Sequence, residues 1–300
     1  MDLYESHKDH RDKFEILAFH DNSAKDFDEL DKKCDQPRKL YWQGKNLPFP
    51  ILLDSTGQTL KTYEIRAFPT TILIDPEGKL VGEASEEQLE AKLPALPVET
   101  RLAKALDRNV TYSFDNTELK QAVEILSKVS RIPIRLDPAA LKTVGITPET
   151  HVPYTMSGFV TLRSALNLLL CAYDLAAMKD EKGLVIVYRK RGETSSPELS
   201  EMQRFCAKRI EEVLNKPMTF EFKDKKLAEV ATHFENATME SFVLDPAARK
   251  AGLLDPAASV TGSAKGEPLG KGLAKLLDPL GLKAIVRDEV VIVTTKSPAN

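Results

Sequence analysis

The chain of 300 residues contains an internal repeat, and this repeat limits its possible folds more than any other feature. The stretch 109–190 begins NVTYSFDNTELKQAVEILSKVSRIPIRLDPAALKTVG, and the stretch 217–296 begins PMTFEFKDKKLAEVATHFENATMESFVLDPAARKAG. Both carry the triplet LDP in register, and both close with an apolar run, LVIVYRK in the first and VVIVTTK in the second. A match of this length predicts a duplicated domain.

Each copy has the pattern of a small α+β module. Its first segment alternates apolar and polar residues, a period of two that predicts a strand with one buried face. A run with helical spacing follows, and then a short apolar strand that ends at Asp-Pro, because proline cannot donate to a β ladder. The expected order is strand, helix, strand, strand, helix, strand, strand. The alternating apolar positions are Val110, Tyr112 and Phe114 in the first copy and Met218, Phe220 and Phe222 in the second.

Two turn-rich segments mark the boundaries of these modules. GETSSPELSE at 192–201 is polar and contains a proline, and PALP at 94–97 separates the repeats from an N-terminal segment of different character. We therefore expect three parts: an N-terminal domain over residues 1–93, a first repeat module over 100–191 and a second over 202–297.

The N-terminal segment has the element order of an α/β domain. EILAFHD at 15–21 and PILLD at 50–54 are expected strands, with a helix over 27–34 between them. The stretch 67–82, AFPTTILIDPEGKLVG, predicts a strand, an Asp-Pro-Glu-Gly turn and a return strand. SEEQ at 85–88 has the residues of a capping box and predicts the start of a further helix.

The run FPTTILIDPEG at 68–78 resembles the thioredoxin-like redoxins, the group of thiol-disulfide interchange proteins and thiol-specific antioxidants. In that family a cis proline begins a strand and is followed by threonine, apolar residues, aspartate and a glycine turn. The resemblance covers residues 1–93 and implies a thioredoxin-like fold. It also implies that Phe68, Pro69 and Thr70 line a groove for a substrate peptide or disulfide. The alternative is that Pro69 only starts an edge strand.

The chain departs from this family at the cysteines that carry out its chemistry. Thiol-disulfide exchange needs a thiolate at a helix N-terminus and a resolving cysteine three residues on. The three cysteines, Cys34, Cys171 and Cys206, form no CxxC. The strand that precedes this motif in the family is also absent, so its two neighbours in the sheet would lose a ladder partner. We expect an incomplete domain with no catalytic residues. It would result from a truncated gene product or from a start codon assigned too far downstream.

The two repeat modules resemble the short N-terminal domain of secretins and TonB-dependent receptors. The resemblance rests on the alternating first strand, the helix that follows it, and the pattern SALNLLL…LVIV at 164–187. It implies protein–protein contacts in the cell envelope and no catalysis. The second copy is irregular over 262–272, where several glycines occur. The sequence therefore does not define a third strand in this copy.

The net charge and the absence of ligand motifs argue against nucleic-acid, membrane, metal and cofactor binding. The net charge is −3, and no apolar run approaches the roughly 18 residues that span a bilayer, so we expect no nucleic-acid partner and no membrane span. The basic run at 188–191 is interpreted as a solvated strand end. His7 and His10 could share a metal with Glu5 or Asp9, but we interpret this helix as a solvated face and expect no metal and no cofactor.

The favoured function is therefore that of a redoxin-type thiol-disulfide oxidoreductase that is inactive as given. Its partners would be the protein thiols or disulfides of the complete family. The alternative is a non-catalytic interaction protein of the cell envelope that binds a protein partner through the repeats. The N-terminus has no signal-peptide pattern. We expect a cytoplasmic protein if Met1 is the true start, and an exported or envelope protein if the chain is truncated.

Overall fold

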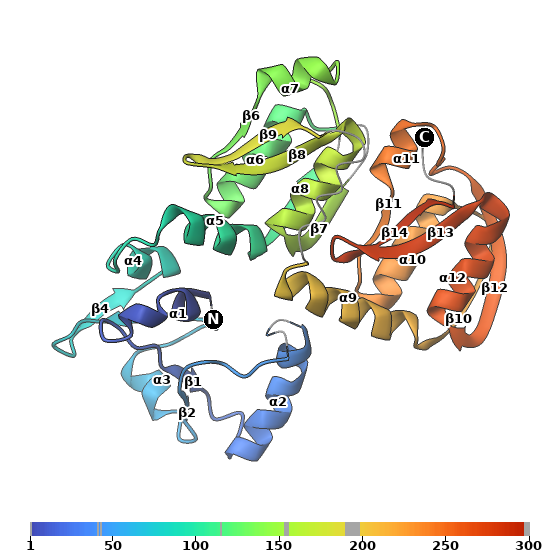
Figure 1. Ribbon diagram of the computed structural model, residues 1–300. Coiled ribbons are helices and arrows are strands. Elements are labelled where there is room, and N and C mark those ends of the chain that lie inside the picture. Colours follow the sequence, from blue (N-terminus) through green and yellow to red (C-terminus); the bar gives the residue numbers. More distant parts are fainter. Residues whose placement is uncertain are drawn as a thin grey trace. The chain divides into compact units, whose positions relative to one another are not determined.

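The computed structural model describes residues 2–40, 42, 44–114, 116–152, 156–189 and 199–296. It divides the chain into two compact units, Met1–Lys104 and Ala105–Asn300, here called unit 1 and unit 2 (Figure 1). In the described part of the chain, no helix is long and apolar enough to cross a membrane.

Unit 1 is a mixed α/β unit of short elements. The capping box at Ser85 is present: the Ser85 amide donates to Gln88 Oε1 at 2.9 Å, and the Gln88 amide donates to Ser85 Oγ at 3.4 Å. The last helix, α5, runs on into the first residues of unit 2. The elements are α1 (Asp2–Ser6), η1 (Lys8–His10), β1 (Ala18–His20), α2 (Phe27–Leu40), β2 (Ile51–Leu53), α3 (Gln58–Thr62), β3 (Ile72–Ile74), β4 (Leu80–Glu83), α4 (Glu86–Glu90) and α5 (Val98–Asp107).

The strands of unit 1 form two separate two-stranded sheets. β1 pairs with β2 in parallel, with Phe19 opposite Leu52, and β3 pairs with β4 antiparallel. Within the described residues no pairing joins the two sheets. The expected strand over 15–21 is shorter than predicted, since only β1 is extended and paired. A two-stranded sheet gains little stability by itself, because each strand has one open edge.

Unit 2 contains two series of elements in the same order (Figure 1). We call residues 105–189 its first half and residues 199–296 its second half. The first half contains β5 (Asn109–Phe114), α6 (Leu119–Ser130), β6 (Ile134–Leu136), α7 (Pro138–Thr143), β7 (Met156–Thr161), α8 (Leu162–Leu170), η2 (Cys171–Tyr173), β8 (Leu175–Asp180) and β9 (Gly183–Tyr188). The second half contains α9 (Glu201–Leu214), β10 (Pro217–Lys226), α10 (Leu227–Thr238), β11 (Phe242–Leu244), α11 (Pro246–Lys250), β12 (Ser259–Pro268), α12 (Leu269–Leu277), η3 (Asp278–Leu280), β13 (Leu282–Arg287) and β14 (Val290–Thr295).

Strand pairing is also the same in the two halves. In the first half β5 pairs antiparallel with β7, and a second sheet has the order β6-β9-β8. In the second half β10 pairs antiparallel with β12, and the second sheet has the order β11-β14-β13. Helices α6 and α8 contact strands of both sheets of the first half, and α10 and α12 do so in the second. Each half thus encloses an apolar core between two helices and two small sheets.

The helical faces agree with the apolar spacing, except at their last turns. Leu119, Ala122, Val123 and Leu126 of α6 are buried, as are Leu227, Val230 and Phe234 of α10. Val129 and Ala237, which continue the same spacing, are exposed, Val129 by 41%. Both positions lie where the helix is about to end, so the apolar stripe continues past the buried part of each helix.

Two short helices and one long strand differ from the expected order. The Asp-Pro step that ends β6 and β11 also starts α7 and α11, with Asp137 and Asp245 as N-caps. Each aspartate accepts a hydrogen bond from the backbone amide two residues on, at 2.9 Å, and proline is favourable in the first helical turn. The third strand of the second copy, which the sequence did not define because of its glycines, is the ten-residue strand β12.

Candidate functional site

The loop that leads into β3 carries the three residues predicted to bind substrate. The Phe68–Pro69 peptide bond is cis. Thr70 Oγ1 donates to the Ala67 carbonyl oxygen at 2.7 Å, and the Thr71 carbonyl accepts from the Ala84 amide at 2.9 Å. Phe68 is 64% exposed. The loop is therefore tied at both ends and presents an aromatic ring to solvent.

The segment before this loop is fixed by the buried carboxylate of Asp54. Asp54 ends β2, and its oxygens accept hydrogen bonds from the amides of Gln58 at 3.0 Å and Leu60 at 3.1 Å, and from the Thr56 hydroxyl at 3.3 Å. Burial by itself raises the pKa of Asp54, but the hydrogen bonds from Leu60, Thr56 and their neighbours outweigh it and lower the pKa. The ionised side chain thus caps α3.

A shallow depression beside α3 is lined by polar side chains only. Its residues are Thr56, Gln58, Lys61 and Thr62. It contains none of the three predicted substrate-binding residues.

The cysteines, all within the described residues, are free thiols with no disulfide between them. Cys34 lies on α2 in unit 1, whereas Cys171 and Cys206 lie in unit 2. Burial raises the pKa of both Cys171 and Cys206 to about 12. Unit 1 therefore contains a single cysteine, and the other two are held as neutral thiols.

One of the two histidines near the N-terminus, His7, does not lie on the solvated face that the sequence predicted. His7 is 2% exposed, and its Nδ1 lies 3.2 Å from the Leu3 carbonyl oxygen. Its ring makes an edge contact with Phe14 at a centroid distance of 6.3 Å. The interpretation was wrong for His7 because the chain after η1 turns back and covers it. Among the described residues, no three histidine, cysteine or carboxylate side chains meet as a metal site.

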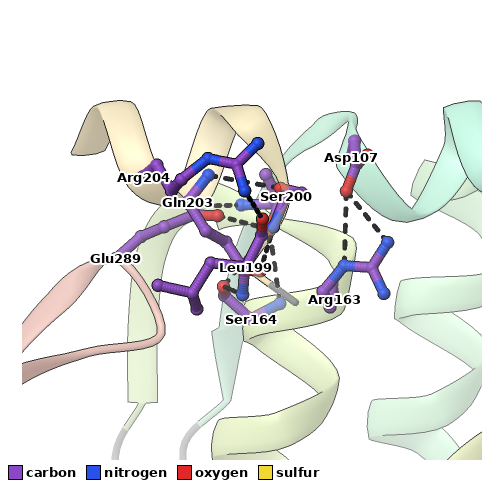
Figure 2. A network of polar contacts seen from close by, with 9 residues as sticks. Asp107, Arg163, Ser164, Leu199, Ser200, Gln203, Arg204 and Glu289 are labelled. Carbon is purple, nitrogen blue, oxygen red and sulfur yellow. Dashed lines mark hydrogen bonds and ion pairs between the residues drawn. The ribbon is translucent and has the colours of Figure 1, made fainter. Parts of the chain in front are cut away.

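A buried polar cluster lies in unit 2, where the sequence predicted no site (Figure 2). The Thr161 amide donates to Glu289 Oε2 at 2.7 Å, and Thr161 Oγ1 donates to Glu289 Oε1 at 2.6 Å. Gln203 Nε2 donates to Ser164 Oγ at 3.4 Å, and Gln203 also closes the capping box of α9 with Ser200. Glu289 belongs to the turn between β13 and β14, so it reaches the first half from the far end of the sequence.

Sequence patterns could not reveal this cluster. Asp288 and Glu289 form a polar turn of two residues, a composition typical of solvated hairpins. Glu289 is 7% exposed only because the turn meets the start of α8, which lies 128 residues earlier in the chain. Burial raises the pKa of Glu289, against the opposing effect of the hydrogen bonds from Thr161.

Comparison with known proteins gives a partial likeness to one family. The chain is 39% identical over 74 residues to the thiol-disulfide oxidoreductase ResA of Bacillus thuringiensis subsp. konkukian (strain 97-27), which is 23% of this chain and 40% of that protein. ResA of Bacillus cereus (strain ATCC 10987 / NRS 248) gives the same values. ResA of Bacillus subtilis (strain 168) is 40% identical over 45 residues, 15% of this chain and 25% of the relative.

No family model matches the chain, and no solved structure matches it. The chain spans about two fifths or less of the length of these curated relatives. The likeness supports a thioredoxin-like redoxin segment over part of the chain.

Proposed function

We propose that unit 1 is the substrate-receiving part of a thiol-disulfide oxidoreductase-like domain, with Phe68, Pro69 and Thr70 as its contact residues. The observation that carries the proposal is the exposed Phe68 ring on a loop that two hydrogen bonds hold in place. The partial likeness to proteins named thiol-disulfide oxidoreductase supports the substrate class, a protein thiol or disulfide. An apolar ring beside a fixed turn suits an extended peptide, whose side chain can cover it.

The same proposal holds that this chain by itself does not turn over disulfides. Exchange needs one thiolate to attack the disulfide and a second thiol to resolve the mixed disulfide. Unit 1 has only Cys34, and Cys171 and Cys206 are neutral thiols at ordinary pH. We expect no acceleration of insulin reduction by dithiothreitol when the chain is added. A rate of insulin reduction that rises in proportion to the concentration of the chain would contradict the proposal.

Binding can be tested apart from turnover. We expect Phe68→Ala to weaken retention of a fluorescent peptide that contains one disulfide by about tenfold, since an aromatic contact residue contributes on the order of 1–2 kcal/mol. Val81→Ala is the matched control, because Val81 on β4 is also an exposed apolar residue of unit 1. Equal affinities for the wild type and Phe68→Ala would refute the contact.

A second function concerns unit 2. The shared element order and strand pairing of its halves support a duplicated module, with the repeats over 100–191 and 202–297 and the redoxin part over 1–93. On this reading the repeats are non-catalytic and bind a protein partner, as their resemblance to the short domain of secretins and TonB-dependent receptors implies. We expect the full chain and the chain without residues 1–93 to cross-link to the same envelope protein. Loss of that cross-link on removing residues 1–93 would contradict this function.

A further inference from the structure

The two halves of unit 2 contact each other through surfaces that are not equivalent. Thr161, at the start of α8, donates two hydrogen bonds to Glu289, and Asn167 Nδ2 of α8 donates to Asp288 Oδ1 at 2.9 Å. The short helix η2 that follows α8 contacts α11 of the second half. The first half therefore contributes a helix to this contact, whereas the second half contributes the β13–β14 turn and the elements around its three-stranded sheet.

Helix α8 has a second buried face besides the one in its own core. Ser164 and Leu168, one turn apart on this face, are both 0% exposed. Gln203 of the second half donates to Ser164 Oγ at 3.4 Å (Figure 2). Cys171, on the next turn, interacts electrostatically with Asp245 of the second half. The second face of α8 is thus covered by the second half.

The corresponding helix of the second half, α12, has no such apolar face. Leu162 and Leu269 are the first residues of α8 and α12, and the two helices have equal length. Counted from these residues, Lys271, Lys275 and Asp278 occupy the places of the three second-face residues of α8. All three are exposed. The second face of α12 is therefore charged and solvated.

The sheet that meets α8 is also buried on both faces. Val291 and Val293 of β14 belong to the core of the second half, so Val290 and Ile292 point to the opposite, outer face of the sheet. Val290 is 1% exposed and Ile292 is 0% exposed, although neither belongs to that core. Because the first half contacts the turn and the short helix beside this sheet, it covers the outer face.

The equivalent outer face of the first half is open. Leu184 and Ile186 of β9 are buried, so Val185 and Val187 point outward, and both are partly exposed. Met178 of β8 lies opposite Val185 and is 57% exposed. The outer face of the β6-β9-β8 sheet therefore presents apolar side chains to solvent, at the places where the second half receives α8.

One ion pair crosses this open face. Arg135 of β6 lies opposite Val185, and its guanidinium binds the carboxylate of Asp180 on β8. The two side chains are 45% and 34% exposed. The apolar patch of Met178, Val185 and Val187 thus has a charged border, which is typical of a surface that binds a protein partner.

We propose that the outer face of the β6-β9-β8 sheet binds an amphipathic helix of another protein. The docking face of that helix carries a small residue, a leucine and a small residue at i, i+4 and i+7, the pattern of Ser164, Leu168 and Cys171. A second copy of the chain does not supply this helix, because α12 would place Lys275 where leucine is needed, and burying an unpaired charge is costly. The inference rests on the proposed partner binding by the repeats and assigns its surface.

The probe is a stapled helical peptide with that docking face, charged residues elsewhere and a fluorescein label. A staple is needed because isolated short helices are marginal in water. We expect fluorescence anisotropy to show saturable binding to the full chain, and at least about tenfold weaker binding to Met178→Glu, which places a charge in the apolar patch. Ala176→Glu, on the same face of β8, should have the same effect.

Met239→Glu is the matched control, because Met239 is also a methionine of unit 2 and is 89% exposed. It should bind the peptide as the wild type does, and a peptide with lysine in place of the central leucine should not bind. Unchanged far-UV circular dichroism shows that the variants are folded. No binding to the wild type, or equal binding to the wild type and both β8 variants, would overturn the proposal.

Two further measurements separate this surface from the other possibilities. If the cross-link to an envelope protein persists undiminished in Met178→Glu, the repeats bind their partner elsewhere, and the surface is wrong while the partner-binding function stands. If the wild type forms no such cross-link, that function fails. Self-association of the wild type that Met178→Glu abolishes, measured by sedimentation, would overturn the choice of another protein in favour of a second copy.

Discussion

The three cysteines of the chain differ in the environment of the thiol. Cys206 is 7% exposed and packs on α9, and the Cys171 thiol donates to the Leu168 carbonyl oxygen at 3.4 Å. A thiolate in such places would lose its hydration. This effect of burial outweighs the favourable charge of Arg287 near Cys171 and of Arg209 near Cys206, so the pKa of each thiol is raised. Cys34 lies on the charged helix α2 and is only partly buried.

This difference predicts a ranking of thiol reactivity. Raising the pKa from the ordinary 9.0 to about 12 lowers the thiolate fraction of Cys171 and Cys206 at pH 8 about a thousandfold. We expect one thiol, Cys34, to react with a chromogenic disulfide reagent in the native chain and the other two to react only on unfolding. Cys34→Ser should remove the native reaction. Three equally fast thiols would contradict the prediction.

At the scale of elements, two glycines explain how α12 packs on the sheet of β10 and β12. A Cβ atom at Gly272 would lie 2.9 Å from Cε1 of Phe220 and 3.1 Å from the Cβ of Ala264. One at Gly262 would lie 2.8 Å from the Leu276 side chain. The irregular glycines that obscured the third strand in the sequence are therefore places where helix and strand approach closely.

This close packing gives opposite expectations for two glycines of the same helix. Gly272→Ala should lower the free energy of unfolding by about 1–3 kcal/mol, because the new methyl group overpacks the buried Phe220 ring. In Gly270→Ala the new Cβ meets only Leu214, its carbonyl oxygen at 3.4 Å and its Cβ at 3.6 Å, so the higher helix propensity of alanine should raise stability by up to about 1 kcal/mol. Urea unfolding of both variants checks this, and equal effects of the two would refute the packing account.

At the scale of the whole chain, the units differ in how well they bury apolar side chains. Unit 2 has continuous cores under α6, α8, α10 and α12. In unit 1 five strand residues are between 40% and 59% exposed: Phe19, Leu52, Ile74, Leu80 and Val81. Less apolar burial means a smaller hydrophobic contribution to stability.

We therefore expect unit 1 to unfold at a lower urea concentration than unit 2. Trp42 is the only tryptophan and lies in unit 1, so its fluorescence reports unit 1, whereas far-UV circular dichroism is dominated by the helices of unit 2. The fluorescence transition should precede the circular dichroism transition. Coincident transitions would show that the two units unfold together.

The sequence determined the elements whose signal is local. Alternating residues located β5 and β10, helical spacing located α6, α8 and α10, and the Asp-Pro steps marked the ends of β6 and β11. It missed α7 and α11, because five or six residues carry too little periodicity to be recognised. The predicted substrate-binding residues Phe68, Pro69 and Thr70 were chosen by resemblance, and their contact with substrate remains a prediction.

Only the tertiary structure decided which polar residues are buried. His7 is covered by a turn of the chain, and Glu289 by a helix start 128 residues away, although each lies in a run that is polar in the sequence. It also decided that the strands of unit 1 form two small sheets. Local patterns set the preference of each segment for helix or strand, but burial and pairing depend on contacts between distant segments, which single-sequence periodicity does not encode.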